Sequence, residues 1–333
     1  MPAAESQQFT AALRQGDLAA LRRVPKADLH NHFVLGGSRA YLQQKTGWEI
    51  PPLRRPLQSM EQMHRWTQEH LGARFDSGPM RRLLIEAAFE QARQDGVSVL
   101  EIGEDVWGLR AYFHGDVGEL TDAFLGARDR IAPAMELRLQ IGLSRHCGIG
   151  DLLSWLEPFW GRKEFVSIDL YGDEAAQPIE NFVPIYQKAR ENGLRCKAHL
   201  GEWGTAEDVV RGVEVLGLDE VQHGIAAAAS DDALAYLREH RIRLNVTPSS
   251  NVLLGRVARM ADHPIAKLYR AGVDVTINSD DVLIFGSEVS REYQALYENG
   301  VLTAAELDAI RQNGLRPLAA LSTQNSTGGN LCP

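Results

Sequence analysis

Strand-like and helix-like segments alternate eight times along this chain, and that alternation limits the fold more than any other feature. Most of the apolar, strand-like runs are followed by a stretch whose apolar residues recur every three or four positions. Such alternation is typical of a parallel sheet, and eight units close into a (β/α)8 TIM-type barrel. The sequence therefore predicts an α/β chain with one barrel domain over residues 1–333. The predicted strands are 27–32, 97–103, 137–144, 165–172, 194–201, 220–224, 242–248 and 274–279, and the clearest helices are 179–192, 205–216, 231–240 and 263–271.

An open, doubly wound sheet is the alternative arrangement for the same pattern. That fold carries a glycine-rich phosphate loop after its first strand, and no such loop follows residues 27–32 here. The one long departure from the alternation is the segment 33–82, which separates the first two predicted strands. We therefore expect a barrel with a helical insertion after strand 1.

The insertion contains the sequence LQSMEQMHRWTQEHL, which has the pattern of a helix. We expect residues 59–71 to form a lid over the mouth of the barrel, because lids exclude water from such sites. His64 and Trp66 are the expected inward-facing residues of this lid. A surface helix without a role at the site is the alternative.

Composition narrows the class of protein. The net charge of −9 argues against a broad surface for nucleic acid or anionic membranes. The polar N-terminus has no apolar signal core, and no run approaches the roughly 18 apolar residues of a membrane span. The three cysteines, Cys147, Cys196 and Cys332, are odd in number and far apart. They indicate reduced thiols in a cytoplasmic protein, with Cys196 as part of the core.

Residues able to bind metal or move protons gather where four of the predicted strands end. In a barrel, the C-terminal ends of different strands meet over one mouth, and chemistry takes place there. Each of these residues has an ordinary structural explanation when taken alone, as a hydrogen-bonded core histidine or as an acid at the start of a helix. Their concentration at one end of four strands favours a shared site instead. They are His30, His32, His199, Glu202, His223, Asp280 and Asp281.

Four of these residues form a plausible set of metal ligands. His30 and His32 are two positions apart, so in a strand both imidazoles point to the same side. Together with His199 and Asp280 they offer three nitrogens and one oxygen. This set suits one Zn²⁺ per chain, with Fe²⁺, Mn²⁺ and Ni²⁺ as alternatives.

At this point the chain resembles the adenosine/adenine deaminase branch of the metal-dependent amidohydrolase superfamily. Six motifs carry the resemblance, in the same order as in the family, and the match extends from about residue 26 to the low 300s. The motifs are KADLHNH (26–32), IDLYGDE (168–174), HLGEWG (199–204), VQHG (221–224), TPSSN (247–251) and INSDDVLIFGS (277–287).

The resemblance implies a hydrolytic deaminase that converts a 6-aminopurine base or nucleoside to a 6-oxopurine and ammonia. It assigns the metal to His30, His32, His199 and Asp280, and the ion lowers the pKa of a bound water. It also implies that His223 and Asp280 orient this water and that His223 can take part in its deprotonation.

The same resemblance implies how a purine ring is held. Glu202 would be protonated and would donate to ring N1, since a buried acid can remain neutral at pH 7. Asp281 would hydrogen-bond N7, and the backbone N–H of Gly172 would meet N3. The implied partner is therefore a small purine.

This sequence departs from the family pattern in three places. After the second histidine it has Phe-Val-Leu-Gly-Gly at 33–37, where adenosine deaminases carry an acid that serves the ribose 5′-hydroxyl; Val34 stands at that position. Val282 replaces the usual proline after the Asp pair, and strand two ends in EIGEDVW where many relatives have Arg and Pro. The departures bear on the choice of substrate.

Two other functions remain open from the sequence. One is a different hydrolase on the same scaffold that cleaves an amide or cyclic amidine. Strand four ends in Tyr171 and Gly172 and offers no lysine for carboxylation, which favours the deaminase. The other is an inactive barrel that binds a nucleoside or a metal. The native metal, the exact substrate and the oligomeric state stay open.

Overall fold

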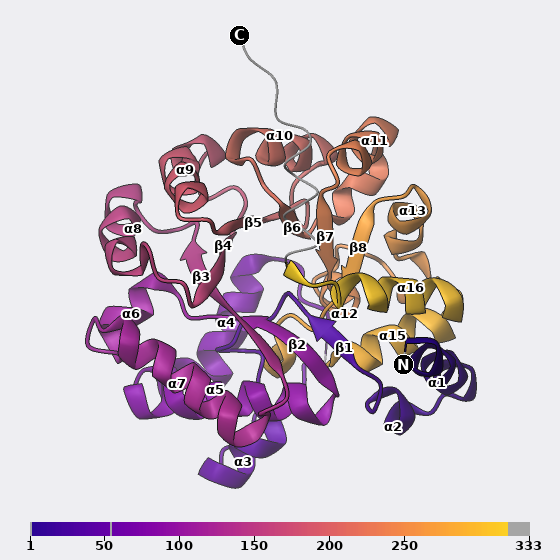
Figure 1. The fold of residues 1–333 in the computed structure, drawn as a ribbon, viewed down its shortest axis with the longest axis horizontal. Coiled ribbons are helices and arrows are strands. Elements are labelled where there is room, and N and C mark those ends of the chain that lie inside the picture. Colours follow the sequence, from indigo (N-terminus) through magenta and orange to yellow (C-terminus); the bar gives the residue numbers. More distant parts are fainter. Residues whose placement is uncertain (1, 54, 319–333) are drawn as a thin grey trace.

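The computed structural model describes residues 2–53 and 55–318 and contains the predicted eight-stranded barrel. Each strand pairs in parallel with the next along the chain, in the order β1 to β8 (Figure 1). The observed strands lie within a few residues of the predicted ones. They are β1 Lys26–Asp28, β2 Val97–Ile102, β3 Glu136–Ser144, β4 Phe165–Tyr171, β5 Arg195–Leu200, β6 Glu220–His223, β7 Arg243–Val246 and β8 Asp274–Ile277.

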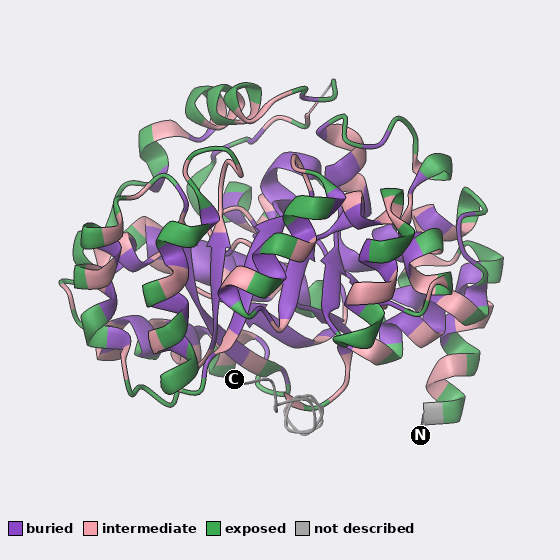
Figure 2. Cartoon of the chain, turned by 90° about the horizontal axis from the view of Figure 1, so that it is seen from above, coloured by how far each residue is buried: buried purple, intermediate pink, exposed green. Residues whose placement is uncertain are grey.

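Helices surround the barrel, and Figure 2 shows buried strands inside a layer of helices whose outward faces are exposed. The α-helices are α1 Pro2–Gln15, α2 Leu18–Leu21, α3 Arg39–Thr46, α4 Met60–His70, α5 Gly78–Gln94, α6 Val106–Tyr112, α7 Val117–Ile131, α8 Ile149–Leu156, α9 Val183–Glu191, α10 Ala206–Leu216, α11 Asp231–Glu239, α12 Pro248–Leu253, α13 Ile265–Arg270, α14 Val282–Phe285, α15 Val289–Glu298 and α16 Ala304–Gly314. The 3-10 helices are η1 Gly72–Phe75, η2 Glu157–Phe159, η3 Ile179–Phe182, η4 Ile225–Ala229 and η5 Met260–Asp262.

The predicted helices begin and end where local sequence signals place them. The predicted helix 205–216 is α10, which Thr205 starts with a capping box to Asp208 and which ends at Gly217 in the left-handed region. The insertion holds α3, α4, η1 and the start of α5, as expected for a helical segment between β1 and β2.

The seam between β8 and β1 closes the barrel through individual hydrogen bonds. The Asp280 N–H donates to the His30 carbonyl at 2.9 Å, and the Leu29 N–H donates to Asn278 Oδ1 at 2.8 Å. The β1 ladder ends at Asp28, four residues before the predicted end of the strand. His30 and His32 therefore lie just beyond the strand, where side chains replace part of the backbone pairing.

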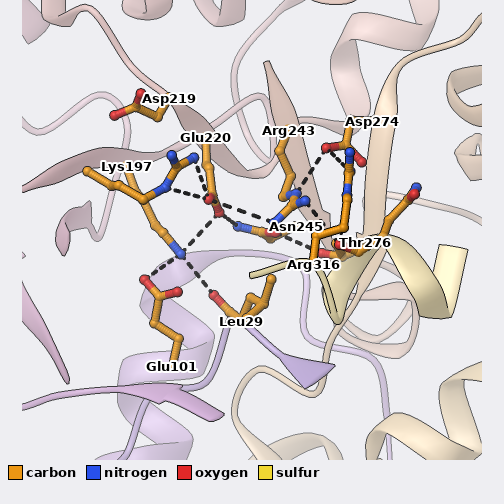
Figure 3. Close-up of polar contacts among 12 residues, drawn as sticks. Leu29, Glu101, Lys197, Asp219, Glu220, Arg243, Asn245, Asp274, Thr276 and Arg316 are labelled. Carbon is orange, nitrogen blue, oxygen red and sulfur yellow. Dashed lines mark hydrogen bonds and ion pairs between the residues drawn. The ribbon is translucent and has the colours of Figure 1, made fainter. Parts of the chain in front are cut away.

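A layer of buried charges fills the barrel interior below this seam (Figure 3). The Lys197 ammonium lies 2.7 Å from Glu101 Oε1 and 3.1 Å from Glu220 Oε2, and all three side chains are buried. Asn245 Nδ2 donates to Glu220 Oε2 at 2.8 Å, while the Asn245 carbonyl faces Nδ1 of His30 at 3.0 Å. The charged layer thus reaches the first of the predicted metal ligands.

The structure also bears on the predictions about the cysteines, membrane-spanning helices and domain organisation. Cys196 is fully buried in the core as expected, Cys147 is half-buried, and Cys332 lies outside the described residues. Within the described ranges, no helix has both the length and the apolar character needed to cross a membrane. The single-domain organisation of all 333 residues stays a prediction, since it includes residues 319–333.

Candidate active site

The structure brings all seven strand-end residues to one end of the barrel. His199 is the penultimate residue of β5, His223 ends β6, and Asp280 follows β8 after two further residues. Six of the seven line one cavity of about 410 Å³, and His30 lies directly beneath it against His199. The cavity also contains Gly172, so it includes each residue that the sequence assigns to substrate binding.

Three imidazole nitrogens converge on one point of this cavity. Nε2 of His199 lies 3.0 Å from Nε2 of His30 and 3.1 Å from Nε2 of His32. Oδ1 of Asp280 lies 3.9 Å from Nε2 of His30 and 3.6 Å from Nε2 of His32. Two ligands of a tetrahedral zinc at normal bond lengths are about 3.3 Å apart, so the spacing fits a single ion.

The outer nitrogens of two of these rings fix their tautomers. Nδ1 of His30 faces only the carbonyl of Asn245, and Nδ1 of His199 faces the Asp169 carboxylate at 3.4 Å and the Leu170 carbonyl at 3.3 Å. Both Nδ1 atoms therefore carry a proton, so when the two rings are neutral their Nε2 lone pairs are bare and point at each other. A cation between them removes this repulsion, and partners of this kind orient metal-binding histidines in general.

Burial keeps the pKa of two rings low. Desolvation lowers the pKa of His30 to about 3 and also lowers the pKa of His32. Burial acts in the same direction on His199, but the Asp169 carboxylate outweighs it and raises that pKa. Neutral rings are the form that binds metal.

Two site residues have an unusual backbone. Among the described residues, His223 and Asp280 are two of four non-glycine residues with positive φ, each at 61°. Such a conformation costs of order 1–3 kcal/mol and persists where the surrounding structure imposes it. Here it turns both side chains toward the cavity at the point where their strands end.

Glu202 is a buried acid placed beside this cluster. Its side chain is 9% exposed, and Oε2 lies 3.6 Å from Nε2 of His223. Burial, followed by the negative charge of Asp280, raises the pKa of Glu202 to about 8. Its Oε1 atom has no hydrogen-bond partner in the protein and remains available to a bound molecule.

A second glutamate holds the loop that carries Glu202. The Glu174 carboxylate accepts the backbone N–H groups of four consecutive residues at 2.8, 3.0, 2.7 and 3.4 Å. These residues are Gly201, Glu202, Trp203 and Gly204. The sequence places Glu174 in the motif IDLYGDE, but it does not reveal this contact, because backbone donors leave no signal in residue types.

Asp281 and Gly172 complete the polar side of the cavity. Burial and the adjacent Asp280 charge raise the pKa of Asp281 well above its usual range, and its Oδ1 has no protein partner. Gly172 has φ of +103°, and a Cβ there would lie 3.2 Å from His146. A side chain would therefore be strained at the position where the backbone borders the cavity.

The insertion covers the cavity through α4. Met60, Met63, His64 and Thr67 line the cavity, and they share one face of the helix. Trp66 is on the flank of that face. It packs on the apolar cluster of Leu57, Leu254, Ile284 and Phe285 instead of lining the cavity. Both residues thus face inward as expected, His64 onto the cavity and Trp66 onto the apolar cluster beside it.

The departures from the family pattern also have structural counterparts. Phe33, Val34 and Leu35 all line the cavity and present an apolar wall. Val282 begins α14, and its N–H donates to the Asp280 carbonyl at 3.2 Å, a bond that proline cannot make. At the end of β2, Glu104 is paired with Arg81 of α5 at 3.5 Å.

Comparison with known proteins agrees with these features. The model of the family described as adenosine deaminase matches residues 76–327. A putative adenosine/adenine deaminase of Treponema pallidum is 32% identical over 289 residues, covering 87% of this chain and 96% of the relative. An adenine deaminase from Arthrobacter aurescens has a similar structure, with TM-score 0.75, 23% identity, and coverage of 91% of this chain and 97% of the other. A zinc-bound amidohydrolase from Burkhoderia ambifaria gives TM-score 0.73, 21% identity and coverage of 92% and 90%. This chain therefore belongs to the adenosine/adenine deaminase family of the amidohydrolase superfamily.

Proposed function

We propose that this protein is a metal-dependent hydrolytic deaminase of a 6-aminopurine base or nucleoside. One observation carries the proposal: a buried carboxyl group, Glu202, whose pKa burial raises to about 8, lies beside a convergent cluster of three histidines and one aspartate in the same cavity. Membership of the deaminase family supports the reaction class.

The proposed metal site consists of His30, His32, His199 and Asp280. The bare Nε2 lone pairs of His30 and His199, 3.0 Å apart, support a cation there. When bound, a divalent ion supplies a Lewis acid that makes water nucleophilic near neutral pH. Three nitrogens and one oxygen favour Zn²⁺, one per chain, over Fe²⁺, Mn²⁺ or Ni²⁺.

The remaining residues hold the purine and move its protons. Ring nitrogens N7 and N1 accept hydrogen bonds, so each needs a donor. Burial raises the pKa of both Asp281 and Glu202, which favours the protonated, donating form of each carboxyl group. The Gly172 N–H is assigned to N3. Protonation of N1 by Glu202 makes C6 electrophilic, which is general acid catalysis.

The proposed reaction replaces the amino group on C6 with an oxygen from water. Water forms a bond from its oxygen to C6, and N1 receives the Glu202 proton. The proton that water loses in this step goes to the amino group, the C6–amino bond breaks, and ammonia leaves. The proton on the new C6 hydroxyl returns to Glu202, and the product is a 6-oxopurine.

Metal analysis and an ammonia-release screen test the proposal together. The purified full chain should contain one divalent ion per chain and release ammonia from at least one 6-aminopurine, and His199→Ala should lose the ion. Full activity without any metal would end the metal assignment. Metal without ammonia from any purine would point to another hydrolase or to an inactive nucleoside-binding barrel.

We also propose a cytoplasmic location and a role in purine metabolism. The support is the fully buried free thiol of Cys196, which fits a reducing compartment, together with the small-molecule cavity. Fractionation of cells that express the tagged chain should recover it with cytoplasmic markers. Recovery with periplasmic or membrane markers would contradict the location.

A further inference from the structure

A line of buried polar side chains runs from the candidate site toward α13. Nδ1 of His223 lies 3.2 Å from Nδ2 of Asn251, and Oδ1 of Asn251 lies 3.2 Å from Nε2 of His263. All three residues are at least 97% buried. Neither Asn251 nor His263 lines the cavity, so any effect they have on the reaction passes through His223.

The backbone N–H of Ile265 determines which atom donates in each of these hydrogen bonds, because a backbone N–H can only donate. The backbone N–H of Ile265 donates to Nδ1 of His263 at 3.2 Å, so that nitrogen carries no proton. Burial lowers the pKa of His263 to about 3, so the ring is neutral and its single proton lies on Nε2. Nε2 therefore donates to Oδ1 of Asn251, and this contact orients the amide.

The amide then determines the tautomer of His223. With Oδ1 facing His263, the Asn251 amide nitrogen faces His223, and an amide nitrogen only donates. Nδ1 of His223 must accept, which leaves the ring proton on Nε2. The Thr247 hydroxyl lies 3.0 Å from the same Nδ1 and 3.3 Å from Asp280 Oδ2, and its one proton can go to either, so it does not decide the tautomer.

We propose that Asn251 and His263 are positioning residues that hold His223 as the Nε2–H tautomer, so that His223 donates a hydrogen bond into the cavity. This tautomer is the opposite of the one found in His30 and His199, whose Nε2 atoms are bare. It explains how His223 can share the cavity with the metal-binding histidines without being a ligand.

The proposal rests on the proposed deaminase function and changes one role within it. With its proton on Nε2, His223 cannot accept the proton that water loses on bonding to C6. It instead donates to the reacting oxygen, a role of the kind that stabilises developing negative charge. The proton passes to the Asp280 carboxylate, which returns it to the departing ammonia.

Nitrogen-15 NMR of the zinc-loaded, full-length protein tests the tautomer directly. In the wild type, His223 should show a protonated Nε2 and an unprotonated Nδ1, with its signals assigned by their loss in His223→Gln. A protonated Nδ1 on His223 would overturn the proposal. This readout does not depend on turnover, so it stands even where no purine releases ammonia, an outcome that would instead remove the proposed function.

Variants of the two positioning residues test the role. In Asn251→Asp the carboxylate only accepts, so His223 should switch to the Nδ1–H tautomer with zinc content unchanged. A wrong histidine tautomer costs about 10⁴-fold in a serine protease triad, so kcat should fall by about 10² to 10⁴ with KM within about threefold. The exposed Asn181→Asp makes the same chemical change elsewhere and should leave both unchanged.

A conservative pair at His263 separates positioning from folding. The glutamine amide of His263→Gln can still donate to Asn251 and should retain the wild-type tautomer and most of kcat. His263→Leu has no donor and should lose both. Equal activity of the two folded variants, or an Asn251→Asp enzyme with wild-type kcat, would contradict the role.

Discussion

Glu202 is the residue on which the proposed chemistry depends most directly. Glu202→Gln keeps the shape of the side chain but cannot transfer a proton, so kcat should fall by roughly 100- to 10,000-fold while the metal stays bound. Glu207→Gln, an exposed acid in the first turn of α10, is the matched control and should have no effect. Stoichiometric loss of metal in Glu202→Gln would show that Glu202 is a ligand.

The raised pKa of Glu202 predicts a pH dependence of definite sign. The protonated acid is the active form, and burial places its pKa at about 8. The kcat/KM value of the free enzyme should therefore be maintained below this pH and fall about tenfold per pH unit above it. A rate that instead rises through pH 8 to 9 would mean that Glu202 acts as a base.

Val34 predicts weak recognition of a ribose 5′-hydroxyl. A buried hydroxyl without a partner costs about 1 to 3 kcal/mol, which is roughly a 5- to 150-fold loss of binding. Besides Glu202, Asp280 and Asp281, the one carboxylate among the described residues that line the cavity is Asp105. It already accepts a hydrogen bond from the Trp107 indole N–H at 3.0 Å. The ratio of kcat/KM for adenosine to that for 5′-deoxyadenosine should be close to one or lower, and Val34→Asp should raise it. A hundredfold preference of the wild type for adenosine would refute this reading of Val34.

At the scale of elements, α4 combines an exposed outer face with an apolar inner one. Removal of the Trp66 ring takes away its packing on the apolar cluster beside the cavity. Trp66→Ala should therefore lower kcat/KM on the order of tenfold, about 1.4 kcal/mol, because the cover fits less closely. Arg65→Ala lies on the exposed face, where Arg65 pairs only with Glu61, and serves as the control. Unchanged KM and kcat in Trp66→Ala would show that α4 is not a lid.

The sequence predicts elements better than it predicts contacts. The spacing of apolar residues and the positions of turn residues locate each strand and the clearest helices, because backbone preference and burial act locally. Chemical type at strand ends is enough to assemble the seven candidate site residues. The Glu174 contact could not be predicted because its donors are backbone N–H groups, which all residues share. The hydrogen bonds from His263 through Asn251 to His223 could not be predicted because they join side chains from three separate segments. The amphipathic pattern predicts that Trp66 faces inward, but it cannot show whether the ring lines the cavity or packs beside it.

At the scale of the whole molecule, the barrel interior depends on balanced buried charges. Lys197→Met leaves Glu101 and Glu220 without their shared cation, and breaking a buried pair costs about 3–5 kcal/mol. The free energy of unfolding, measured by urea denaturation, should fall by that amount. Lys188→Met removes a largely exposed pair with Glu157 and should cost less than about 1 kcal/mol. Equal losses in the two variants would show that the interior charges contribute no more than surface ones.

The proposed metal site at the seam between β8 and β1 uses residues from both the first and the last strand, and this determines when the site can form during synthesis. The proposed ligands are 30, 32, 199 and 280, so a growing chain cannot complete the set until nearly its entire length has been made. Under the proposed assignment, metal binding by the complete ligand set is therefore a late step. Once bound, the ion joins the first and last strands where the backbone ladder is replaced by single hydrogen bonds. At a free concentration 1,000 times its dissociation constant, an ion that binds only the folded state adds about 4 kcal/mol to its stability, so loss of the proposed ion would weaken the contact between β1 and β8 most directly.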